Sequence, residues 1–379
     1  MTAVVTGVAG FVGSHLAEAL VEAGHRVVGI DCLTDYYDAA AKRQNLRLLG
    51  GRANFEFVLA DLRTAELEPM LAGADVVFHQ AGQPGVRKSW STGFVDYSTH
   101  NIVGTQRLLE AARRVRCPRV VYASSSSVYG NAPAYPTSEA SLPHPHSPYG
   151  VTKLAAEHLC SLYAANWGLP TVSLRYFTVY GPRQRPDMAF RRLIDAAVDG
   201  RSFALYGSGR QVRDFTYVGD VVAANLAAGG ADVAPGTVVN IAGGASASMN
   251  EVIELVGELT GAPVALERQP AMPGDVERTG GTIDAADRSL GWAPVTSLRD
   301  GLEAQVAWSR RRLAERDRRS PIGAVDGLPD PASDPAPDPA ADRVPEPASE
   351  PARRRGPRTT IRVLDGRAHL APVRPGDHR

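Results

Sequence analysis

The sequence predicts an α/β protein in which a doubly wound parallel sheet is joined to a smaller mixed α/β domain. Six short β-branched runs alternate with helix-like stretches over residues 1–175, which is the pattern of parallel strands connected by helices. The chain has 379 residues, of which 44% are hydrophobic, so a large buried core can form. Beyond about residue 317 the composition changes, and neither domain extends into that segment.

The strands of the large sheet are predicted first. Each is a run of β-branched or aromatic residues between turn residues, at 3–6, 26–30, 55–59, 75–79, 119–123 and 171–175. Helical spacing of apolar residues predicts the connecting helices, at 11–23, about 95–114 and 148–167. Helices should therefore cover both faces of the sheet.

The pattern of residues 176–317 is too fragmented for a second complete parallel sheet. It predicts helices and two short strands, with helices near 187–199, 217–228, 249–260 and 299–316 and strands near 203–206 and 237–241. We therefore expect a cofactor domain over 1–175, with returning segments at about 210–242. A substrate domain should comprise about 176–209 and 243–317.

The C-terminal segment has the composition of a disordered chain. Residues 321–379 hold 12 of the 28 prolines and no Phe, Tyr or Trp, so they cannot build a core. We predict a disordered tail over 318–379. The arginine cluster at 353–355 could attract an acidic partner, but a solvated charge run explains it better.

Charge and cysteine content exclude several functions. Lys plus Arg and Asp plus Glu both number 41, which removes the electrostatic case for binding nucleic acid or a membrane surface. No apolar run approaches the ~20 residues that span a bilayer, and no basic signal-peptide start is present, so we expect a cytoplasmic protein. Cys32, Cys117 and Cys160 lack disulfide or metal-ligand spacing, which predicts buried thiols and no metal site.

Three glycines follow the first predicted strand, in Gly7-Val-Ala-Gly10-Phe-Val-Gly13. At such a position the first glycine permits a tight turn, the second a close approach to a pyrophosphate, and the third helix–strand packing. A flexible turn would explain the glycines alone about as well. The strand-to-helix context favours a dinucleotide site.

Carboxylates end the next two strands. Asp31 stands 24 positions after Gly7, where it can accept hydrogen bonds from the adenosine ribose and repel a 2′-phosphate, so NAD is preferred over NADP. An Asp at a strand end can also be a simple turn residue. Asp61 closes the third strand and is placed to meet the adenine edge.

The fifth strand ends in Ser124-Ser-Ser-Ser-Val-Tyr-Gly130, and the following helix carries Tyr149-Gly-Val-Thr-Lys153. Tyr and Lys four residues apart share a helix face, so an ammonium can lie beside the phenol. That ammonium and a cationic nicotinamide both favour the phenolate, which is a far better base than the phenol. The pair alone is common on helix surfaces, but its place after a serine-bearing strand end is specific.

These motifs together resemble the extended short-chain dehydrogenase/reductases over about residues 1–317. The resemblance implies a Rossmann domain that binds NAD. It makes Tyr149 the base and acid, Lys153 the residue that holds the nicotinamide ribose and lowers the Tyr pKa, and Ser125 the partner of the reacting hydroxyl. Ser124 is the alternative for that last role. The cofactor-binding residues are then Gly7, Gly10, Phe11, Val12, Gly13, Asp31, Lys42, Asp61, Leu62, Tyr149 and Lys153.

Longer strings at 79–87, 175–188, 213–218 and 273–278 are similar to UDP-glucuronate 4-epimerases. This resemblance implies a UDP-sugar substrate whose diphosphate is neutralised by Arg213, with Arg278 as a second cation and Tyr206 against uracil. A surface arginine paired to a local Asp is the alternative at Arg213, where it is the weaker explanation, and at Arg278, where it explains the residue equally well. The implied substrate residues are Pro84, Arg87, Ser125, Ser126, Ser127, Tyr149, Thr178, Arg185, Tyr206, Arg213, Asp275 and Arg278.

Residues 126 and 127 distinguish between possible reactions. Related 4,6-dehydratases carry Asp-Glu there for acid–base elimination, and related UDP-glucuronate decarboxylases carry Glu at 127, whereas this chain has Ser126 and Ser127. The resemblance therefore implies oxidation and re-reduction at C4, giving UDP-galacturonate from UDP-glucuronate through a 4-keto sugar. The neutral hydroxyls would restrain the carboxylate of that β-keto acid.

Other functions stay open at this point. UDP-glucose 4-epimerase is the leading rival because it uses the same chemistry, and UDP-glucuronate decarboxylase follows. A non-enzymatic NAD sensor is disfavoured because such relatives usually lose the Tyr-Lys pair, which is kept here. By analogy with the family, we expect a homodimer built from the helices near 95–114 and 148–167.

Overall fold

The computed structural model describes residues 1–244, 246–271 and 276–319. The predicted tail lies outside these residues, except that the last helix continues through residue 319. Asp275 also lies outside them. No helix within the described ranges is both long and apolar enough to cross a bilayer.

Seven parallel strands form the central sheet, in the order β10-β6-β5-β4-β1-β2-β3, and they confirm the predicted doubly wound fold. The six strands predicted for residues 1–175 are all present, and the strand predicted near 237–241 joins them. The strands are β1 Thr2–Thr6, β2 Arg26–Asp31, β3 Phe55–Leu59, β4 Val76–His79, β5 Val120–Ser125, β6 Thr171–Tyr176 and β10 Thr237–Ile241.

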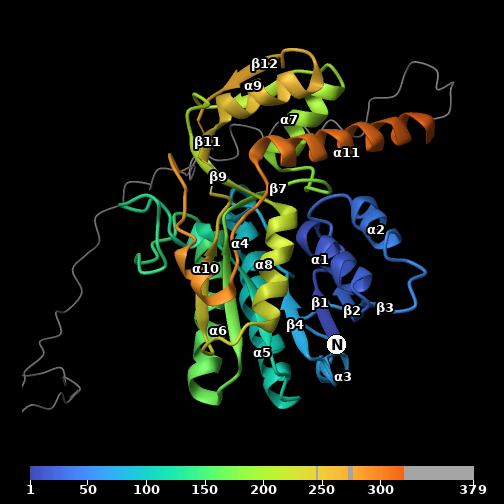
Figure 1. Cartoon of the computed structure of the whole chain (residues 1–379), viewed down its shortest axis with the longest axis vertical. Coiled ribbons are helices and arrows are strands. Elements are labelled where there is room, and N and C mark those ends of the chain that lie inside the picture. The colour runs from blue at the N-terminus through green and yellow to red at the C-terminus, as the bar shows by residue number, and fades with distance from the viewer. Residues whose placement is uncertain (245, 272–275, 320–379) are drawn as a thin grey trace, which may run out of the picture. The chain divides into compact units, whose positions relative to one another are not determined.

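Helices cover both faces of this sheet (Figure 1). One layer, which buries aliphatic side chains against β1, β4, β5, β6 and β10, consists of α1 Phe11–Glu22, α8 Val218–Gly230 and α10 Asp284–Leu290. The opposite layer consists of α3 Glu68–Leu71, α5 Gly104–Arg114 and α6 Pro148–Trp167. A further helix, α2 Ala39–Arg47, follows β2. The inner strands are buried on both sides and are therefore mostly apolar, whereas the edge strand β3 is partly exposed.

The predicted helix at 95–114 is helical throughout but irregular. It comprises α4 Phe94–Tyr97, a π-helical segment Ser98–Val103 and then α5. Such wide turns are frequent at functional sites. Here the segment directs Asn101 toward the loop that follows β4, as described below.

A smaller part of the chain lies beyond one end of the sheet, with α7, α9 and α11 around their own apolar core (Figure 1). It contains a three-stranded sheet, β11-β9-β7, and a parallel pair, β12-β8. Its strands are β7 Thr178–Tyr180, β8 Phe203–Tyr206, β9 Val212–Tyr217, β11 Ser246–Ser248 and β12 Leu266–Gln269. Its helices are α7 Ala189–Val198, α9 Met249–Thr260 and α11 Leu298–Arg319.

The segment that returns to the large sheet is shorter than expected. We predicted a return over about 210–242, but β9 pairs with β7 and β11, and only α8 and β10 join the large sheet. The alternation of Val212–Tyr217 predicts a half-buried strand without indicating which sheet it joins. Which part binds cofactor and which binds sugar stays a prediction at this level.

Strand order reverses between β1 and β4, because the chain runs outward from β1 through β2 and β3 and then returns to start β4 on the other side. Ligands of open α/β sheets bind at the carboxyl ends of the strands beside such a reversal. The fold therefore places a binding crevice at Gly7 and at the loop after His79.

His79, at the end of β4, should make the protein sensitive to acid. The ring is 1% exposed, with Nδ1 2.7 Å from Thr6 Oγ1 and Nε2 2.9 Å from Thr105 Oγ1, and burial lowers its pKa to about 3. Between pH about 6.5 and 3 the unfolded chain binds a proton that the folded chain does not. The free energy of unfolding should thus fall as pH drops through this window, by on the order of 1 kcal/mol per pH unit.

Urea unfolding at several pH values measures this slope. The variant His79→Asn should flatten it, whereas His158→Asn, at an exposed position, should leave it unchanged. An unaltered slope in His79→Asn would assign the acid sensitivity to other groups.

Candidate active site

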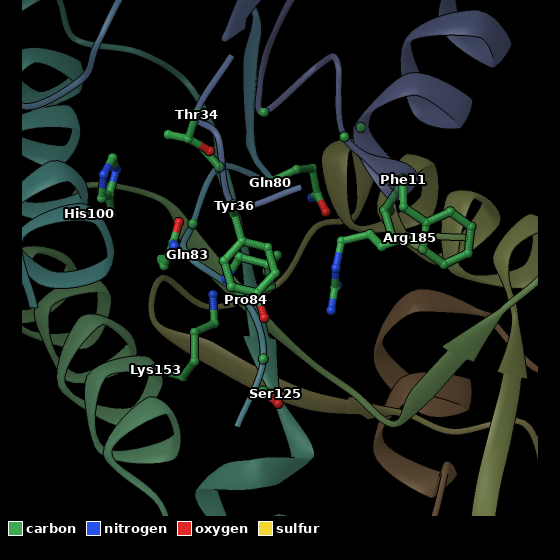
Figure 2. Close-up of a pocket in the computed structure, with 18 of the residues that line it drawn as sticks. Phe11, Thr34, Tyr36, Gln80, Gln83, Pro84, His100, Ser125, Lys153 and Arg185 are labelled. Atoms are coloured by element: carbon green, nitrogen blue, oxygen red, sulfur yellow. The ribbon is translucent and has the colours of Figure 1, made fainter. Parts of the chain in front are cut away.

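A cavity of about 430 Å³ opens at the carboxyl ends of the central strands. Figure 2 shows Lys153 and Ser125 on one side of it, Phe11 and Arg185 on the other, and Tyr36 and Pro84 between them. The residues predicted to bind cofactor all line this cavity, namely Gly7, Gly10, Phe11, Val12, Gly13, Asp31, Lys42, Asp61, Leu62, Tyr149 and Lys153. Six predicted substrate residues besides Tyr149 line it too: Pro84, Ser125, Ser126, Ser127, Thr178 and Arg185.

The glycine turn leaves no room for side chains at two of its positions. Gly7 has a φ of +69°, and a Cβ there would lie 2.7 Å from the backbone nitrogen of Ala81. A Cβ on Gly13 would lie 2.2 Å from the Gly7 carbonyl oxygen. Gly10 caps α1 without a side-chain hydrogen bond, and residues 10–13 at the start of that helix line the cavity. This cradle fits a dinucleotide pyrophosphate.

Asp31 is fixed in orientation where β2 ends. Its Oδ2 accepts from the Ala9 backbone N–H at 3.1 Å, and its Oδ1 accepts from the Leu33 N–H at 2.7 Å. A carboxylate held beside the glycine turn can receive ribose hydroxyls of a dinucleotide. Lys42 donates to the carbonyl and hydroxyl oxygens of Thr34, both at 2.8 Å, so its ammonium contacts the loop rather than the turn.

The part of the cavity around Asp61 contains a group that sequence analysis did not expect there. Cys32 is half-buried and lines the cavity, so our prediction of a buried thiol is wrong for it, although Cys117 and Cys160 are buried. Its Sγ and ligand atoms of Asp61 and His100 lie within 4.8 Å of one another. Both oxygens of Asp61 already accept from the Arg63 guanidinium at 2.7–3.0 Å, and this pairing lowers the Asp61 pKa.

Tyr149 and Lys153 stand on the first turns of α6. That helix starts at Pro148, and the Ser147 hydroxyl caps it by accepting from the Gly150 N–H at 3.1 Å. Burial raises the pKa of Tyr149, while a hydrogen bond with Ser125 and the charge of Arg185 oppose the rise. The net direction is opposite to the lowering that we expected from Lys153.

Lys153 is not among the groups that shift the pKa of Tyr149. Burial lowers the pKa of its ammonium to about 8, against the opposing charges of Cys160 and Glu157. Its Nζ lies 4.6 Å from the centroid of the Tyr122 ring. Lys153 is therefore held at the cavity wall by its own surroundings, and it is available to a ligand there.

The serine run turns sharply where β5 ends. Ser125 is the serine that hydrogen-bonds Tyr149, and its Oγ also accepts from the Ser127 N–H at 3.1 Å. Ser124 instead donates to Glu157 Oε2 at 2.6 Å. Ser126 begins a single 3₁₀ turn, Ser126–Val128. Geometry thus separates the two serines between which the sequence left a choice.

A second cavity of about 190 Å³ lies beside the first, since Ser126, Ser127 and Thr178 line both. Arg213 and His146 also line the second cavity. The Arg213 guanidinium donates to backbone carbonyls, reaching Val276 O at 2.5 Å. The second cavity therefore combines hydroxyl donors with a cation, and both kinds of group bind a phosphate or a carboxylate.

Three predicted substrate residues lie outside the lining of both cavities as the described residues form them. The Arg87 guanidinium lies over the Tyr206 ring, 4.7 Å from its centroid, so the segment after β4 contacts β8 of the smaller part. Arg278 lies over the Tyr135 ring at 5.4 Å. Their roles stay predictions, as does that of Asp275.

Sequence analysis missed several residues that shape the site. Asn101 accepts from the Gln83 N–H at 2.6 Å and donates to the Gln83 carbonyl at 3.0 Å, which fixes the loop after β4. Tyr36 lines the cavity, and Tyr97 donates to the Pro84 carbonyl at 2.6 Å. Arg185 was predicted, but its partner Asp187 was not: the guanidinium forms two hydrogen bonds with that carboxylate, both at 3.0 Å. A single Asn in a helical pattern gives no sequence signal of such a contact, whereas the adjacent tyrosines at 36 and 37 could have been predicted as candidate site residues.

The chain resembles characterised sugar-nucleotide enzymes along most of its length. A protein of Bacillus subtilis described as an uncharacterized UDP-glucose epimerase is 43% identical over 309 residues, covering 81% of this chain and 98% of that protein. The crystal structure of UDP-glucuronic acid 4-epimerase from Bacillus cereus with UDP-glucuronic acid and NAD superposes with a TM-score of 0.80 at 41% identity. That superposition covers 82% of this chain and all of the other.

MoeE5 is a further solved neighbour, with structures that contain NAD and either UDP-glucuronic acid or UDP-glucose. The first has a TM-score of 0.75 at 42% identity and covers 82% of this chain and all of the other. The model of the NAD dependent epimerase/dehydratase family matches residues 3–242, which include the glycine turn, the serine run and the Tyr149–Lys153 pair. The chain belongs to this family of NAD-dependent sugar-nucleotide enzymes.

Proposed function

We propose that the protein is an NAD-dependent 4-epimerase of a UDP-sugar, with UDP-glucuronate as its substrate and UDP-galacturonate as its product. The observation that carries this proposal is the convergence of Tyr149, Lys153 and Ser125 in one cavity with the glycine cradle. The solved neighbours that bind NAD together with UDP-glucuronic acid support it.

Binding is assigned to opposite parts of the cavity. The N-terminus of α1 and the glycine turn hold the NAD pyrophosphate, and Asp31 receives the adenosine ribose. Lys153 holds the nicotinamide ribose. The sugar lies where the two cavities meet, beside Ser126, Ser127 and Thr178, and Arg213 in the second cavity neutralises the diphosphate.

Tyr149 moves the proton. Its phenolate takes the proton of the C4 hydroxyl, and the same oxygen returns it after the sugar has turned over. When bound, NAD accepts a hydride from C4 and gives it back to the opposite face of the 4-keto sugar. The Ser125 hydroxyl, which already hydrogen-bonds Tyr149, also orients the C4 oxygen.

The serine turn and Thr178 protect the intermediate. Oxidation at C4 of glucuronate gives a β-keto acid, which loses CO2 if its carboxylate bond stands perpendicular to the carbonyl plane. Neutral hydroxyls from Ser126, Ser127 and Thr178 restrain the carboxylate without supplying the acid or base of an elimination. UDP-glucuronate decarboxylation is therefore a side reaction to be suppressed, not the main activity.

A second candidate substrate is UDP-glucose. MoeE5 binds UDP-glucose as well as UDP-glucuronic acid, and the Bacillus subtilis relative is described as a UDP-glucose epimerase. Both substrates would use the same residues at C4. The two substrates differ in the substituent at C5, which in this site would contact the hydroxyls of Ser126, Ser127 and Thr178 rather than a positively charged side chain.

Incubation with UDP-glucuronate and UDP-glucose separately, with products resolved by NMR, tests the proposal. We expect UDP-galacturonate from the first at a higher kcat/KM than UDP-galactose from the second. A preference for UDP-glucose would move the assignment to the second candidate. No epimer from either sugar, with NAD bound, would refute 4-epimerisation.

Asp31 should make the enzyme select NAD over NADP. Replacing Asp31 with Ala removes a charged acceptor of two ribose hydrogen bonds, so NAD affinity should fall by about ten- to a hundredfold and NADP should bind comparably. Calorimetric titration of NAD-depleted protein with each cofactor measures both effects. Asp35→Ala, at an exposed position of the same loop, is the control. Tight NADP binding by the parent protein would contradict the assignment.

We also propose a homodimer and a cytosolic location. Exposed apolar side chains on and beside α5 and α6, among them Val103, Val151 and Leu162, support an interface of these helices with a second copy. Light scattering measures the oligomeric state. The cytosolic location stays a prediction from the sequence.

A further inference from the structure

A buried polar network lies directly behind the serine turn. Glu157 on α6 accepts from Ser124 at 2.6 Å and from two nitrogens of the Arg175 guanidinium at 2.7 and 3.0 Å. The third guanidinium nitrogen donates to the Tyr129 hydroxyl at 2.6 Å. That hydroxyl donates in turn to Asn240 Oδ1 at 2.7 Å. All five residues of this network are buried, and none is more than 5% exposed.

The network extends to residues 276–282, which include backbone carbonyls that accept hydrogen bonds from Arg213; we call these residues the Arg213 segment. The Asn240 backbone N–H donates to Glu139 at 2.7 Å, and its side-chain amide donates to the Thr137 carbonyl at 3.0 Å. Thr137 pairs through its backbone with residues 280 and 282. A few residues earlier in the chain, the carbonyls of Val276 and Glu277 accept hydrogen bonds from Arg213.

Tyr129 joins the two halves of this path. Its backbone N–H donates to the Ser126 carbonyl at 3.1 Å, so it closes the serine turn. Its ring lies under the Arg175 guanidinium at 4.7 Å and beside Phe177 at 6.4 Å, which fixes its direction. The hydroxyl is both acceptor and donor, so its removal separates Arg175 from Asn240.

Stability is a weak explanation for such a network. Well-packed apolar residues often replace a buried ion pair without loss of stability, whereas a fully satisfied polar network fixes one arrangement of the groups that it joins. Here those groups are the turn beside the C4 oxygen and the segment beside the diphosphate. The distance between the serine turn and the Arg213 segment decides how firmly the two ends of a bound UDP-sugar are held.

We propose that Tyr129 is a positioning residue whose hydroxyl links the serine turn to the Arg213 segment. This hydrogen-bonded link, the tie, controls whether the 4-keto intermediate is reduced to the epimer, loses CO2 or is released. The inference rests on the proposed function, because it concerns an intermediate of that reaction. With the tie intact, the carboxylate stays in the plane where CO2 loss is slow while the sugar turns over. When the tie is cut, the turn shifts, and a larger share of intermediates loses CO2 or leaves as a free 4-keto sugar.

The variant Tyr129→Phe tests the tie because it removes one oxygen and keeps the ring. Products from UDP-glucuronate are followed as UDP-galacturonate, CO2 and the 4-keto pentose. We expect the ratio of CO2 to epimer to rise by about tenfold, the scale of one lost hydrogen bond, while NAD stays bound. The control is Tyr163→Phe, which removes a hydroxyl from α6 that bonds Glu110 and Gln106 outside this network, and it should leave the ratio unchanged.

A second variant covers the case in which Tyr129→Phe does not fold. Glu139→Ala removes the acceptor of the Asn240 backbone N–H and thereby loosens Asn240, so it should raise the same ratio by a smaller factor. In the double variant the two effects should not add, because both act through Asn240. Unchanged product ratios in folded variants, with only a lower rate or melting temperature, would overturn the proposal and leave a structural role.

The test separates this inference from the proposed function. If the parent protein epimerises only UDP-glucose, the substrate assignment fails, and the tie is then measured as free 4-keto sugar per epimer from UDP-glucose. A rise in that ratio supports the positioning role on either substrate. A constant ratio overturns it on either substrate.

Discussion

Tyr149→Phe should abolish epimerisation while the protein still folds and retains NAD. The substitution removes the oxygen that exchanges a proton with the C4 hydroxyl and leaves the buried ring in place. Loss of a positioned acid–base group slows turnover by about 10²-fold or more. The Ser125 hydroxyl loses one partner but still accepts from the Ser127 N–H, so the serine turn should persist.

Initial rates with saturating UDP-glucuronate measure the effect, and cofactor released on denaturation measures retained NAD. Tyr163→Phe is the matched control, because it removes a hydroxyl from the same helix outside the cavity. A Tyr149→Phe rate above about a tenth of the parent rate would refute the assignment of this phenol as base.

Lys153→Met should lower kcat by about 10²-fold and change its pH dependence. Burial raises the pKa of Tyr149. By the proposed function the Lys153 ammonium and the bound cofactor favour the phenolate together, so the variant should lose part of that support. The residual rate should therefore increase with pH as the unassisted phenol ionises. The parent rate should increase less, because its ammonium, with a pKa of about 8, supports ionisation near neutrality.

The measurement is kcat against pH with NAD added in excess, so that weaker cofactor binding does not mask the effect. Lys88→Met, at an exposed position, should keep the parent profile. Parallel profiles for Lys153→Met and the parent would mean that Lys153 contributes to binding alone.

The parts of the site that sequence analysis predicted are those whose chemistry lies within a few consecutive residues. Gly7, Gly10 and Gly13 form one turn, and Tyr149 and Lys153 form one helix face, so their spacing already contains their geometry. The strands of the large sheet were predictable for a similar reason, since parallel strands buried on both faces are continuous apolar runs.

The parts that escaped prediction depend on contacts between distant residues. Asn101 reaches Gln83, and Arg87 covers Tyr206, only after separate elements have packed. The sequence also does not show which strands pair with β9, because its alternating pattern fits any half-buried sheet. The raised pKa of Tyr149 follows from burial, which no local motif reports.

Hydride transfer at C4 within the bound complex is the central claim, and deuterium at C4 of UDP-glucuronate tests it most directly. NMR and mass analysis of the product should show UDP-galacturonate that keeps the deuterium at C4, with none in water and no net reduction of added NAD. Loss of the deuterium to solvent, or inversion without NAD, would contradict the account.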